Sequence, residues 1–255
     1  MTITLSEDQL REYDRRGIVF PIEVLSTAEV SLFLRELQTI VEHCGGTQKR
    51  LDGLHLFFEW AYRLVSHERL LNVIEDVLGG ELLVDGSLVF YKRPHDLSYV
   101  SWHQDSVYSD WHQTPSTSAW IALTPSHAVN GCMRVIPGSH KHGQMAHNTV
   151  HDGMNLLVRG EQIITVDDSR AVDVVLSPGQ MSLHQSDLVH GSRANTSDEP
   201  RIGFIVRFVT HRVLKRDRPL LRVRGSASCG HLRLGTPPTR QNDESVFLAW
   251  RRANS

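Results

Sequence analysis

Apolar residues recur at helical spacing through the first part of the chain. From Ser26 onward, apolar positions follow one another at intervals of three and four residues, which places them on one face of a helix. Ser26 and Ser6 are each followed three residues later by Glu or Gln, the capping-box pattern that satisfies free amides at a helix start. A third helix is predicted over 66–78, and 54–65 is helical or irregular. We therefore expect residues 1–80 to be mostly helical.

The pattern changes after Gly80, where short β-rich runs alternate with turn residues. Many short strands with regular turns favour a sandwich or barrel, a group that includes jelly rolls. The predicted strands are 82–91, 99–103, 118–123, 132–136, 171–176, 180–184 and 201–209. The last run alternates, with Ile202, Phe204, Val206 and Phe208 on one face and Arg201, Gly203, Ile205 and Arg207 on the other.

The composition fits one domain of 255 residues. Hydrophobic residues make up 40% and charged residues 22%, which is enough to form a sizeable core. Within this domain we expect a helical part over 1–80, a β core over 81–210 and a C-terminal extension over 211–255. A short helix is predicted near the end, over 243–253.

Charge and cysteine content argue against several classes of protein. The formal net charge is −2, so there is no basic field for nucleic acid. The three cysteines lie far apart and form no disulfide framework, which favours a reducing, cytoplasmic setting. The N-terminal residues include acids and do not resemble a signal peptide. No window reaches the roughly 18 apolar residues of a membrane helix, so we expect no membrane partner.

The first candidate site is the motif His103-Gln104-Asp105. Residues two apart on a strand point to the same face, so we expect the imidazole and the carboxylate to lie side by side. A distal histidine would complete a two-histidine, one-carboxylate triad, which leaves positions open on iron(II). The chain has 15 histidines, so the motif alone is weak evidence, and a hydrogen-bonded pair at a strand end is the alternative.

A second constellation lies about ninety residues later. His190-Gly191-Ser192 follows a predicted strand, and Arg201 begins the alternating strand eleven residues after His190. An inward-facing arginine is costly to bury without an anionic partner, and its planar fork suits a carboxylate. The far carboxylate of 2-oxoglutarate is such a partner. The alternative is a strand-edge arginine paired with Asp198 or Glu199.

Several residues near these motifs are candidates for the substrate pocket. His184 precedes His190 by six residues on a predicted barrel strand, and it is either a pocket residue or a core histidine. Trp102, Tyr108 and Trp111 flank the first motif and either wall the pocket or pack at a strand end.

The long polar stretch 141–168 has little periodicity, and loops of this size are often functional lids. His140, His142, His147 and His151 have irregular spacing, so a lid is a better interpretation of this region than a second metal site. Arg134 is available to an anionic group beneath such a lid.

Taken together, these segments resemble the phytanoyl-CoA dioxygenase family of iron(II)- and 2-oxoglutarate-dependent oxygenases. The similarity covers roughly residues 80 to 210, and the segments occur in the family's order. They are Trp102 to Asp105, Ser118 to Leu123, Asn130 to His140, Met181 to His184, Leu188 to Ser192, and Arg201.

The resemblance implies a double-stranded β-helix core with helices packed on its outside. It implies that His103, Asp105 and His190 bind iron(II), and that Arg201 binds the distal carboxylate of 2-oxoglutarate. Halogenating relatives carry a small residue in place of the metal-bound carboxylate, so Asp105 favours a hydroxylase.

The resemblance also implies roles for residues beside the cosubstrate. Ser192 would contribute a hydroxyl group, and Trp120 matches a tryptophan that lies beside 2-oxoglutarate. The partner of the keto-acid end stays open, with Gln104 and Lys92 as candidates.

The predicted activity is hydroxylation of a small molecule, with iron(II), 2-oxoglutarate and O₂ as cofactor and cosubstrates. A small specialised metabolite is the expected substrate. Two alternatives remain at this stage: a cupin-type metalloenzyme that needs no 2-oxoglutarate, and a ligand-binding jelly roll without catalysis. The oligomeric state is not indicated by the sequence.

Overall fold

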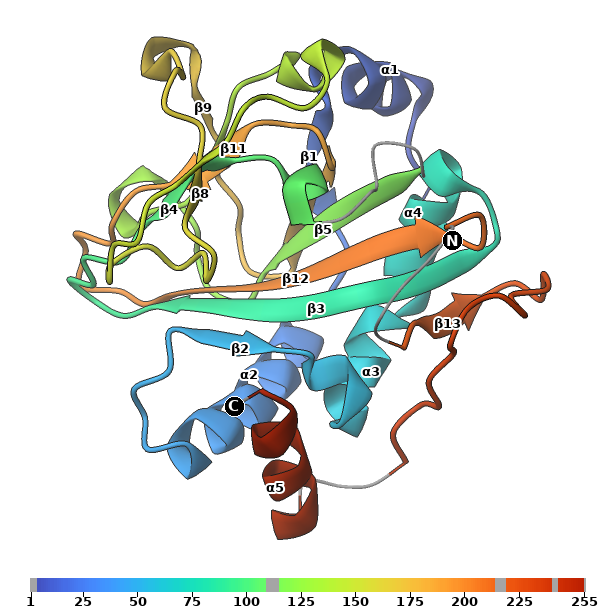
Figure 1. Ribbon diagram of the computed structural model, residues 1–255. Coiled ribbons are helices and arrows are strands. Elements are labelled where there is room, and N and C mark those ends of the chain that lie inside the picture. Colours follow the sequence, from blue (N-terminus) through green and yellow to red (C-terminus); the bar gives the residue numbers. More distant parts are fainter. Residues whose placement is uncertain (1–3, 109–114, 214–218, 240–242, 255) are drawn as a thin grey trace.

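Two antiparallel sheets face each other in a double-stranded β-helix, as the sequence predicted (Figure 1). The computed structural model describes residues 4–108, 115–213, 219–239 and 243–254. Trp111 lies outside these described residues. The larger sheet has the strand order β1-β10-β5-β12-β3-β13, with β2 also paired to β3, and the smaller has the order β4-β11-β6-β9.

The long strands of the larger sheet are β3 (Leu82–Lys92), β5 (Ser116–Ala122), β10 (Gln180–Gln185) and β12 (Arg201–Thr210). The smaller sheet contains β4 (Val100–His103), β6 (Met133–Val135), β9 (Val172–Asp173) and β11 (His190–Ser192). β12 lies between β3 and β5, so both of its edges are paired and its side chains alternate between two buried faces.

Helices cover the outer face of the larger sheet. Figure 1 shows α2 (Thr27–His43), α3 (Glu59–Val65) and α5 (Glu244–Ala253) on one side of β3 and β12, with the smaller sheet on the other. Helix α4 (Glu68–Leu78) contributes its buried face to the same apolar core. The residues of β12 in this core are Ile202, Phe204, Val206 and Phe208, the face that the alternation predicted.

The predicted helix starts are confirmed in atomic detail. In α1 (Glu7–Arg16), the Ser6 side chain accepts a hydrogen bond from the backbone amide of Gln9, and the Gln9 side-chain oxygen accepts one from the backbone amide of Ser6. Ser26 and Glu29 form the same reciprocal pair at the start of α2. These four bonds satisfy amides that a helix leaves without internal partners, which is why the sequence signal was reliable.

The expectation of a mostly helical N-terminal part missed two strands. β1 (Ile18–Glu23) pairs with β10 at the edge of the larger sheet, and β2 (Arg50–Asp52) pairs with β3. Two further short strands, β11 and β13 (Leu221–Arg224), were also not predicted. All four are three to six residues long and are defined by partners distant in sequence, which local periodicity does not reveal.

None of the helices within the described ranges is long and apolar enough to cross a membrane.

The predicted C-terminal helix packs into the main core through Trp250. Its ring is 6% exposed and contacts Phe58, and its indole Nε1 donates a 2.7 Å hydrogen bond to the Asp52 carbonyl oxygen. We expect Trp250→Ala to lower the free energy of unfolding by about 3 kcal/mol, the low end for a buried aromatic. Trp250→Phe should lose only the hydrogen bond, about 1 kcal/mol. Denaturant titration measures both, and equal losses in the two variants would contradict this account.

Candidate metal and cosubstrate site

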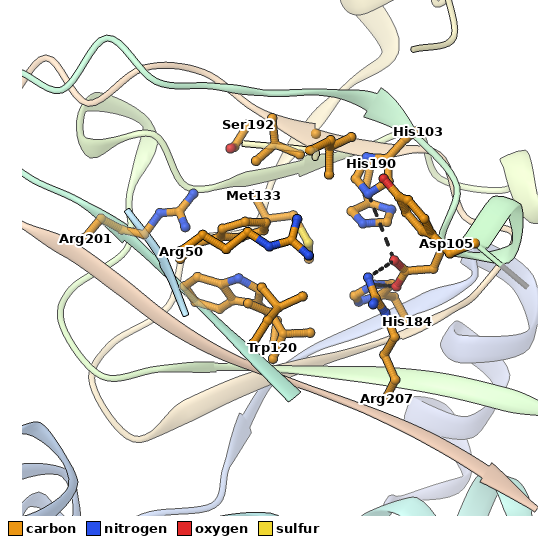
Figure 2. Close-up of a pocket in the computed structure, with 17 residues that line it drawn as sticks. Arg50, His103, Asp105, Trp120, Met133, His184, His190, Ser192, Arg201 and Arg207 are labelled. Atoms are coloured by element: carbon orange, nitrogen blue, oxygen red, sulfur yellow. Dashed lines mark hydrogen bonds and ion pairs between the residues drawn. The ribbon is translucent and has the colours of Figure 1, made fainter. Parts of the chain in front are cut away.

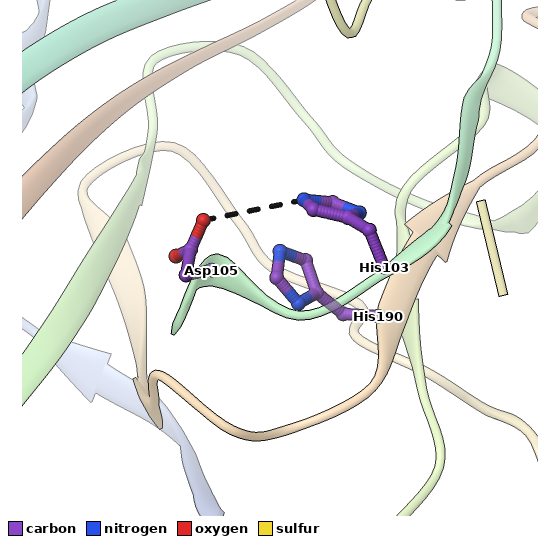
Figure 3. Close-up of side chains that lie close together, drawn as sticks. All are labelled: His103, Asp105 and His190. Atoms are coloured by element: carbon purple, nitrogen blue, oxygen red, sulfur yellow. Dashed lines mark ion pairs between the residues drawn. The ribbon is translucent and has the colours of Figure 1, made fainter. Parts of the chain in front are cut away.

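His103, Asp105 and His190 converge at one end of the barrel (Figure 3). One ligand atom from each lies within 4.8 Å of the others, and all three residues are buried. β11 pairs with β4 so that His190 lies directly opposite His103. The convergence predicted from the two motifs is therefore present.

The local structure that positions Asp105 differs from the one expected. The strand β4 ends at His103, and Asp105 begins a 3₁₀ turn over Asp105–Tyr108. The turn, not the alternation of a strand, brings the carboxylate beside the imidazole, with Asp105 Oδ1 4.0 Å from His103 Nε2.

Backbone carbonyls orient both imidazoles. His103 Nδ1 lies 2.9 Å from the Ser101 carbonyl oxygen, and His190 Nδ1 lies 2.9 Å from that of Leu188. A carbonyl accepts a hydrogen bond, so Nδ1 carries the proton and Nε2 keeps its lone pair. Burial lowers the pKa of His103 to about 4 and that of His190 well below its usual value. Both rings are therefore neutral at pH 7, the state in which imidazole binds a metal.

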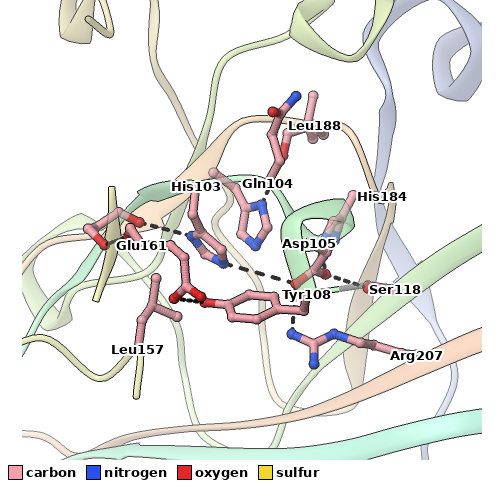
Figure 4. Close-up of polar contacts among 12 residues, drawn as sticks. His103, Gln104, Asp105, Tyr108, Ser118, Leu157, Glu161, His184, Leu188 and Arg207 are labelled. Atoms are coloured by element: carbon pink, nitrogen blue, oxygen red, sulfur yellow. Dashed lines mark hydrogen bonds and ion pairs between the residues drawn. The ribbon is translucent and has the colours of Figure 1, made fainter. Parts of the chain in front are cut away.

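The third ligand lies in a network of buried polar groups (Figure 4). Asp105 Oδ1 accepts a 2.7 Å hydrogen bond from Arg207 Nη2, and Oδ2 accepts one of 2.7 Å from Ser118 Oγ. His184 Nε2 lies 3.6 Å from the same Oδ2. Burial alone would raise the pKa of the Asp105 carboxyl, but the Arg207 charge and these polar contacts hold it well below its usual range. The carboxylate is ionised and ready to bind a cation.

Arg201 lies at the opposite end of the same cavity (Figure 2). Its side chain is 1% exposed, and its Nε and Nη2 both donate to the Gly131 carbonyl oxygen. Within the described residues, its Nη1 has no hydrogen-bond partner. Burial lowers the pKa of the guanidinium to about 10, so it stays charged at pH 7. The alternative, a strand-edge arginine paired with Asp198 or Glu199, does not describe this buried side chain, and a buried cation with an unused donor favours an anionic ligand.

Ser192 and Lys92 lie beside this end of the cavity. Lys92 Nζ donates a 2.7 Å hydrogen bond to Ser192 Oγ, and Lys92 is the strand partner of Arg201. Burial and the neighbouring Arg201 charge lower the pKa of the Lys92 ammonium well below its usual value. Lys92 therefore lies at the Arg201 end, not at the metal end where a keto-acid partner was considered.

The Gln104 side chain forms structural hydrogen bonds and does not point into the cavity. Its side-chain Nε2 donates to the carbonyl oxygens of Gly143 and Asp187, and its Oε1 accepts from the Met145 amide. These bonds use the side chain to hold the 143–145 backbone, and Gln104 does not line the cavity.

The cavity between these two ends has an empty volume of about 610 Å³ when the solvent space at its opening is included. Its apolar walls come from both sheets, with Trp120 and Ile205 from the larger and Met133 and Val100 from the smaller. The Trp120 ring lies 5.2 Å from the Arg201 guanidinium carbon, so the indole forms a wall beside the cation. This placement agrees with the role that the family resemblance implied for Trp120.

Two of the four predicted substrate residues line the cavity and two do not. His184 and Tyr108 line it, and the Tyr108 ring packs edge-on against His103 at 6.2 Å. Trp102 and Arg134 do not line it. They contact each other on the outer side of the smaller sheet, where Arg134 forms ion pairs with acidic side chains.

The outward position of Trp102 follows from its neighbour His103. Successive residues of a strand point to opposite faces, so Trp102 points away from the cavity that His103 lines. A bulge between β4 and β11, where three residue steps on β4 match two on β11, brings Val100 to the cavity side as well.

The stretch 141–168 lies along the free edge of β4. Leu156 N donates to the Tyr99 carbonyl, Ile163 N donates to that of Trp102, and Leu157 lines the cavity. Two short strands, β7 (Asn148–Thr149) and β8 (Glu161–Gln162), pair within it. Its function as a lid stays a prediction. Among the residues described by the structure, the histidines of this stretch form no group suited to a metal.

Gly203 leaves the space that Trp120 occupies. A Cβ atom on Gly203 would lie 2.0 Å from Trp120 Cζ2. We expect Gly203→Ala to lower the free energy of unfolding by about 1–3 kcal/mol, the usual cost of overpacking, and to weaken cosubstrate binding because the indole must move. Thermal unfolding and the KM for 2-oxoglutarate measure the two effects. Gly230→Ala is the control, since nothing lies within 4 Å of its added methyl group, and similar behaviour of the two variants would contradict the expectation.

Sequence reasoning missed Arg207, Ser118 and Arg50 as site residues. Arg207 was placed on the inward face of the alternating strand, a signal that could have identified it, but no role followed. Ser118 and Arg50 gave no comparable signal, because β2 was not predicted and a serine in a strand is common.

The donor set fits iron(II). Two neutral imidazoles and one carboxylate form the facial arrangement used by non-haem iron oxygenases, and the unpaired donor of Arg201 faces the cavity where a chelating dicarboxylate would extend. Fold and site together define a jelly-roll metalloenzyme of the non-haem iron class.

Comparisons with known proteins place the chain within that class. A family model described as phytanoyl-CoA dioxygenase (PhyH) matches residues 13–203. The chain therefore belongs to the phytanoyl-CoA dioxygenase family, and it is a non-haem iron, 2-oxoglutarate-dependent oxygenase. This assignment decides against both alternatives left open by the sequence.

Individual relatives agree with the assignment. The ectoine dioxygenase of Halomonas elongata is 27% identical over 227 residues, which cover 77% of this chain and 68% of that protein. The solved structure of the non-haem monooxygenase ThoJ, in its apo form, is 30% identical with a TM-score of 0.81, covering 95% of this chain and 93% of that one. The epimerase SnoN in complex with Fe³⁺, α-ketoglutarate and nogalamycin RO has a TM-score of 0.69 at 23% identity, covering 92% and 95%, which supports the fold.

Proposed function

We propose that this protein hydroxylates an unactivated C–H bond of a small molecule, with release of succinate and CO₂ from 2-oxoglutarate. The observation that carries the proposal is one cavity with two neutral histidines and an ionised aspartate at one end and a buried arginine with an unused donor at the other. The similarity to a protein described as a non-haem monooxygenase, at 30% identity, supports transfer of one oxygen atom to the substrate.

In this proposal His103, Asp105 and His190 hold iron(II), which with 2-oxoglutarate supplies the oxidising chemistry when bound. Arg201 binds the distal carboxylate, with Ser192 and Lys92 beside it. The walls formed by Trp120, Met133 and Ile205 exclude water from the space between the two ends. The chain's own contribution is therefore geometry and a dry, charged cavity.

The relatives support a small molecule as the substrate. The ectoine dioxygenase that is 27% identical to this chain is named for such a substrate, and we propose a small specialised metabolite here.

Two measurements test the proposal in sequence. Anaerobic addition of iron(II) and 2-oxoglutarate should produce a weak visible charge-transfer band, which requires both the triad and the cosubstrate end. A screen of small molecules under air should then find substrate-triggered succinate formation and a product heavier by one oxygen atom. Absence of the band would overturn the assigned cosubstrate site, and succinate formation without an oxygenated product would overturn hydroxylation.

A further inference from the structure

Arg50 lines the cavity but belongs to neither the metal end nor the Arg201 end. Figure 2 shows its guanidinium among the cavity side chains, between Arg201 and the residues that would bind the metal. It comes from β2, one of the strands that the sequence did not reveal.

Hydrogen bonds to Asp52 and Leu156 hold the Arg50 guanidinium in place. Asp52 accepts two hydrogen bonds, one of 2.7 Å from Nε and one of 2.8 Å from Nη2. The Leu156 carbonyl oxygen accepts a third, of 3.1 Å, from Nη1. Asp52 is itself braced, because its carbonyl oxygen accepts the hydrogen bond from Trp250 of the C-terminal helix. The orientation of Arg50 is therefore set before any ligand arrives.

Two donors of Arg50 remain for a ligand. A guanidinium has five N–H groups, and the three bonds to Asp52 and Leu156 use three of them. The remaining two, one on each terminal nitrogen, have no acceptor within the described parts of the chain. A guanidinium that offers one N–H from each terminal nitrogen can donate to both oxygens of a carboxylate.

The other charges that line the cavity also favour an anion. Arg50, Arg201 and Arg207 line it, and among the described lining residues the only acid is Asp105, which the proposed function uses for the metal. Next to the guanidinium the walls are apolar: Phe90 lies with its ring 5.8 Å from the Arg50 guanidinium carbon, and Leu88 and Leu157 line the same cavity.

We propose that Arg50 determines substrate specificity by binding a carboxylate of the substrate, whose apolar body packs on Leu88, Phe90 and Leu157. The substrate class is thus a small carboxylic acid with a hydrocarbon portion, oriented so that a carbon distant from the acid group reaches the metal. This inference rests on the proposed function and adds the chemical class of the substrate. It also explains why Arg50 is anchored to the stretch 141–168 through Leu156, since a ligand there lies directly beneath that stretch.

The test uses the full-length protein loaded anaerobically with iron(II) and 2-oxoglutarate. The probes are unbranched carboxylic acids of four to eight carbons and the primary amides of the same lengths, with binding measured by calorimetry. Because 2-oxoglutarate already fills its own site, the acids report on the substrate region. We expect the best acid to bind at least about tenfold more tightly than its amide, a difference of about 1.4 kcal/mol.

Three variants make the result specific. Arg50→Gln should abolish the preference for acid over amide while the affinity for 2-oxoglutarate and for amides stays within about twofold. Arg50→Lys should retain part of the preference, because it keeps the charge but not the paired donors. Arg93→Gln is the matched control, since its guanidinium bonds to backbone carbonyls near Gln48 and lies outside the cavity.

The outcomes separate this inference from the proposed function. An equal affinity of the wild type for acids and amides, or a preference that survives in Arg50→Gln, would overturn the role of Arg50. A loss of 2-oxoglutarate affinity in Arg50→Gln would also overturn it, by assigning Arg50 to the cosubstrate. The charge-transfer band of iron(II) and 2-oxoglutarate does not depend on Arg50, so its absence would count against the proposed function instead.

Discussion

Asp105→Ala is expected to abolish hydroxylation and to weaken metal binding on the order of a hundredfold or more, since loss of a supporting residue alone costs 10–100-fold. The variant removes the single anionic ligand and leaves two neutral imidazoles, which hold iron(II) poorly. Binding of Co(II), followed by its visible absorption, measures the loss directly and does not depend on turnover.

The substitution also removes a charge that faces Arg207. Asp105 Oδ1 lies 2.7 Å from Arg207 Nη2, and breaking a buried ion pair by removing one partner costs about 3–5 kcal/mol. A lower melting temperature is therefore expected in the metal-free protein. Asp105→Ala combined with Arg207→Met removes both charges, and it should recover stability without recovering metal binding.

Two further variants test whether the loss of metal binding is specific to the Asp105 carboxylate. Asp198→Ala removes a carboxylate whose side chain is 97% exposed and should leave metal affinity unchanged. Ser118→Ala removes the 2.7 Å hydrogen bond to Asp105 Oδ2 and should cost about 10–100-fold, the usual range for a supporting residue. Full activity of Asp105→Ala under controlled iron would refute the metal site.

Arg201→Met should raise the KM for 2-oxoglutarate by a factor of about a hundred or more. Two charge-assisted hydrogen bonds to a carboxylate contribute about 1.5–3 kcal/mol each, and methionine fills the space without replacing them. The fully buried position strengthens the effect, because water cannot substitute for the lost donors. Titration of the charge-transfer band with 2-oxoglutarate measures this affinity, and steady-state kinetics measure the KM.

The same variant should leave metal binding nearly intact, because Arg201 lies at the far end of the cavity from the triad. Arg11→Met is the control for a lost arginine, since its side chain is 66% exposed on α1. An unchanged KM in Arg201→Met would assign the cosubstrate carboxylate to another group, with Lys92 the first to test.

Strand β12 contributes side chains both to the apolar core and to the cavity. Its outer face packs on the helices through Phe204 and Phe208, and its inner face presents Arg201 and Arg207 to the cavity. Both arginines belong to a strand that is paired on both edges. The position of Arg201 and that of Arg207, the partner of Asp105, therefore depend on the same rigid element.

Local signals in the sequence were sufficient for part of this structure. The capping boxes at Ser6 and Ser26 set helix starts because their hydrogen bonds are made within four residues. The alternation of β12 assigned its two faces correctly because that strand is central and pairs with β3 and β5. The motifs around His103 and His190, read together, identified the family and predicted the three residues that the structure brings together.

Other features depended on pairing between distant segments. The bulge between β4 and β11 placed Val100 on the same side as His103, and the turn after His103 placed Asp105, neither of which residue spacing predicts. Ion pairs such as Arg207 with Asp105 join residues about a hundred positions apart. By itself, the sequence determined the periodic elements, since these depend on neighbours along the chain, and its short motifs predicted His103, Asp105 and His190 as metal ligands. Only the tertiary structure decided which side chains share the cavity, because that depends on strand register and packing across the whole fold.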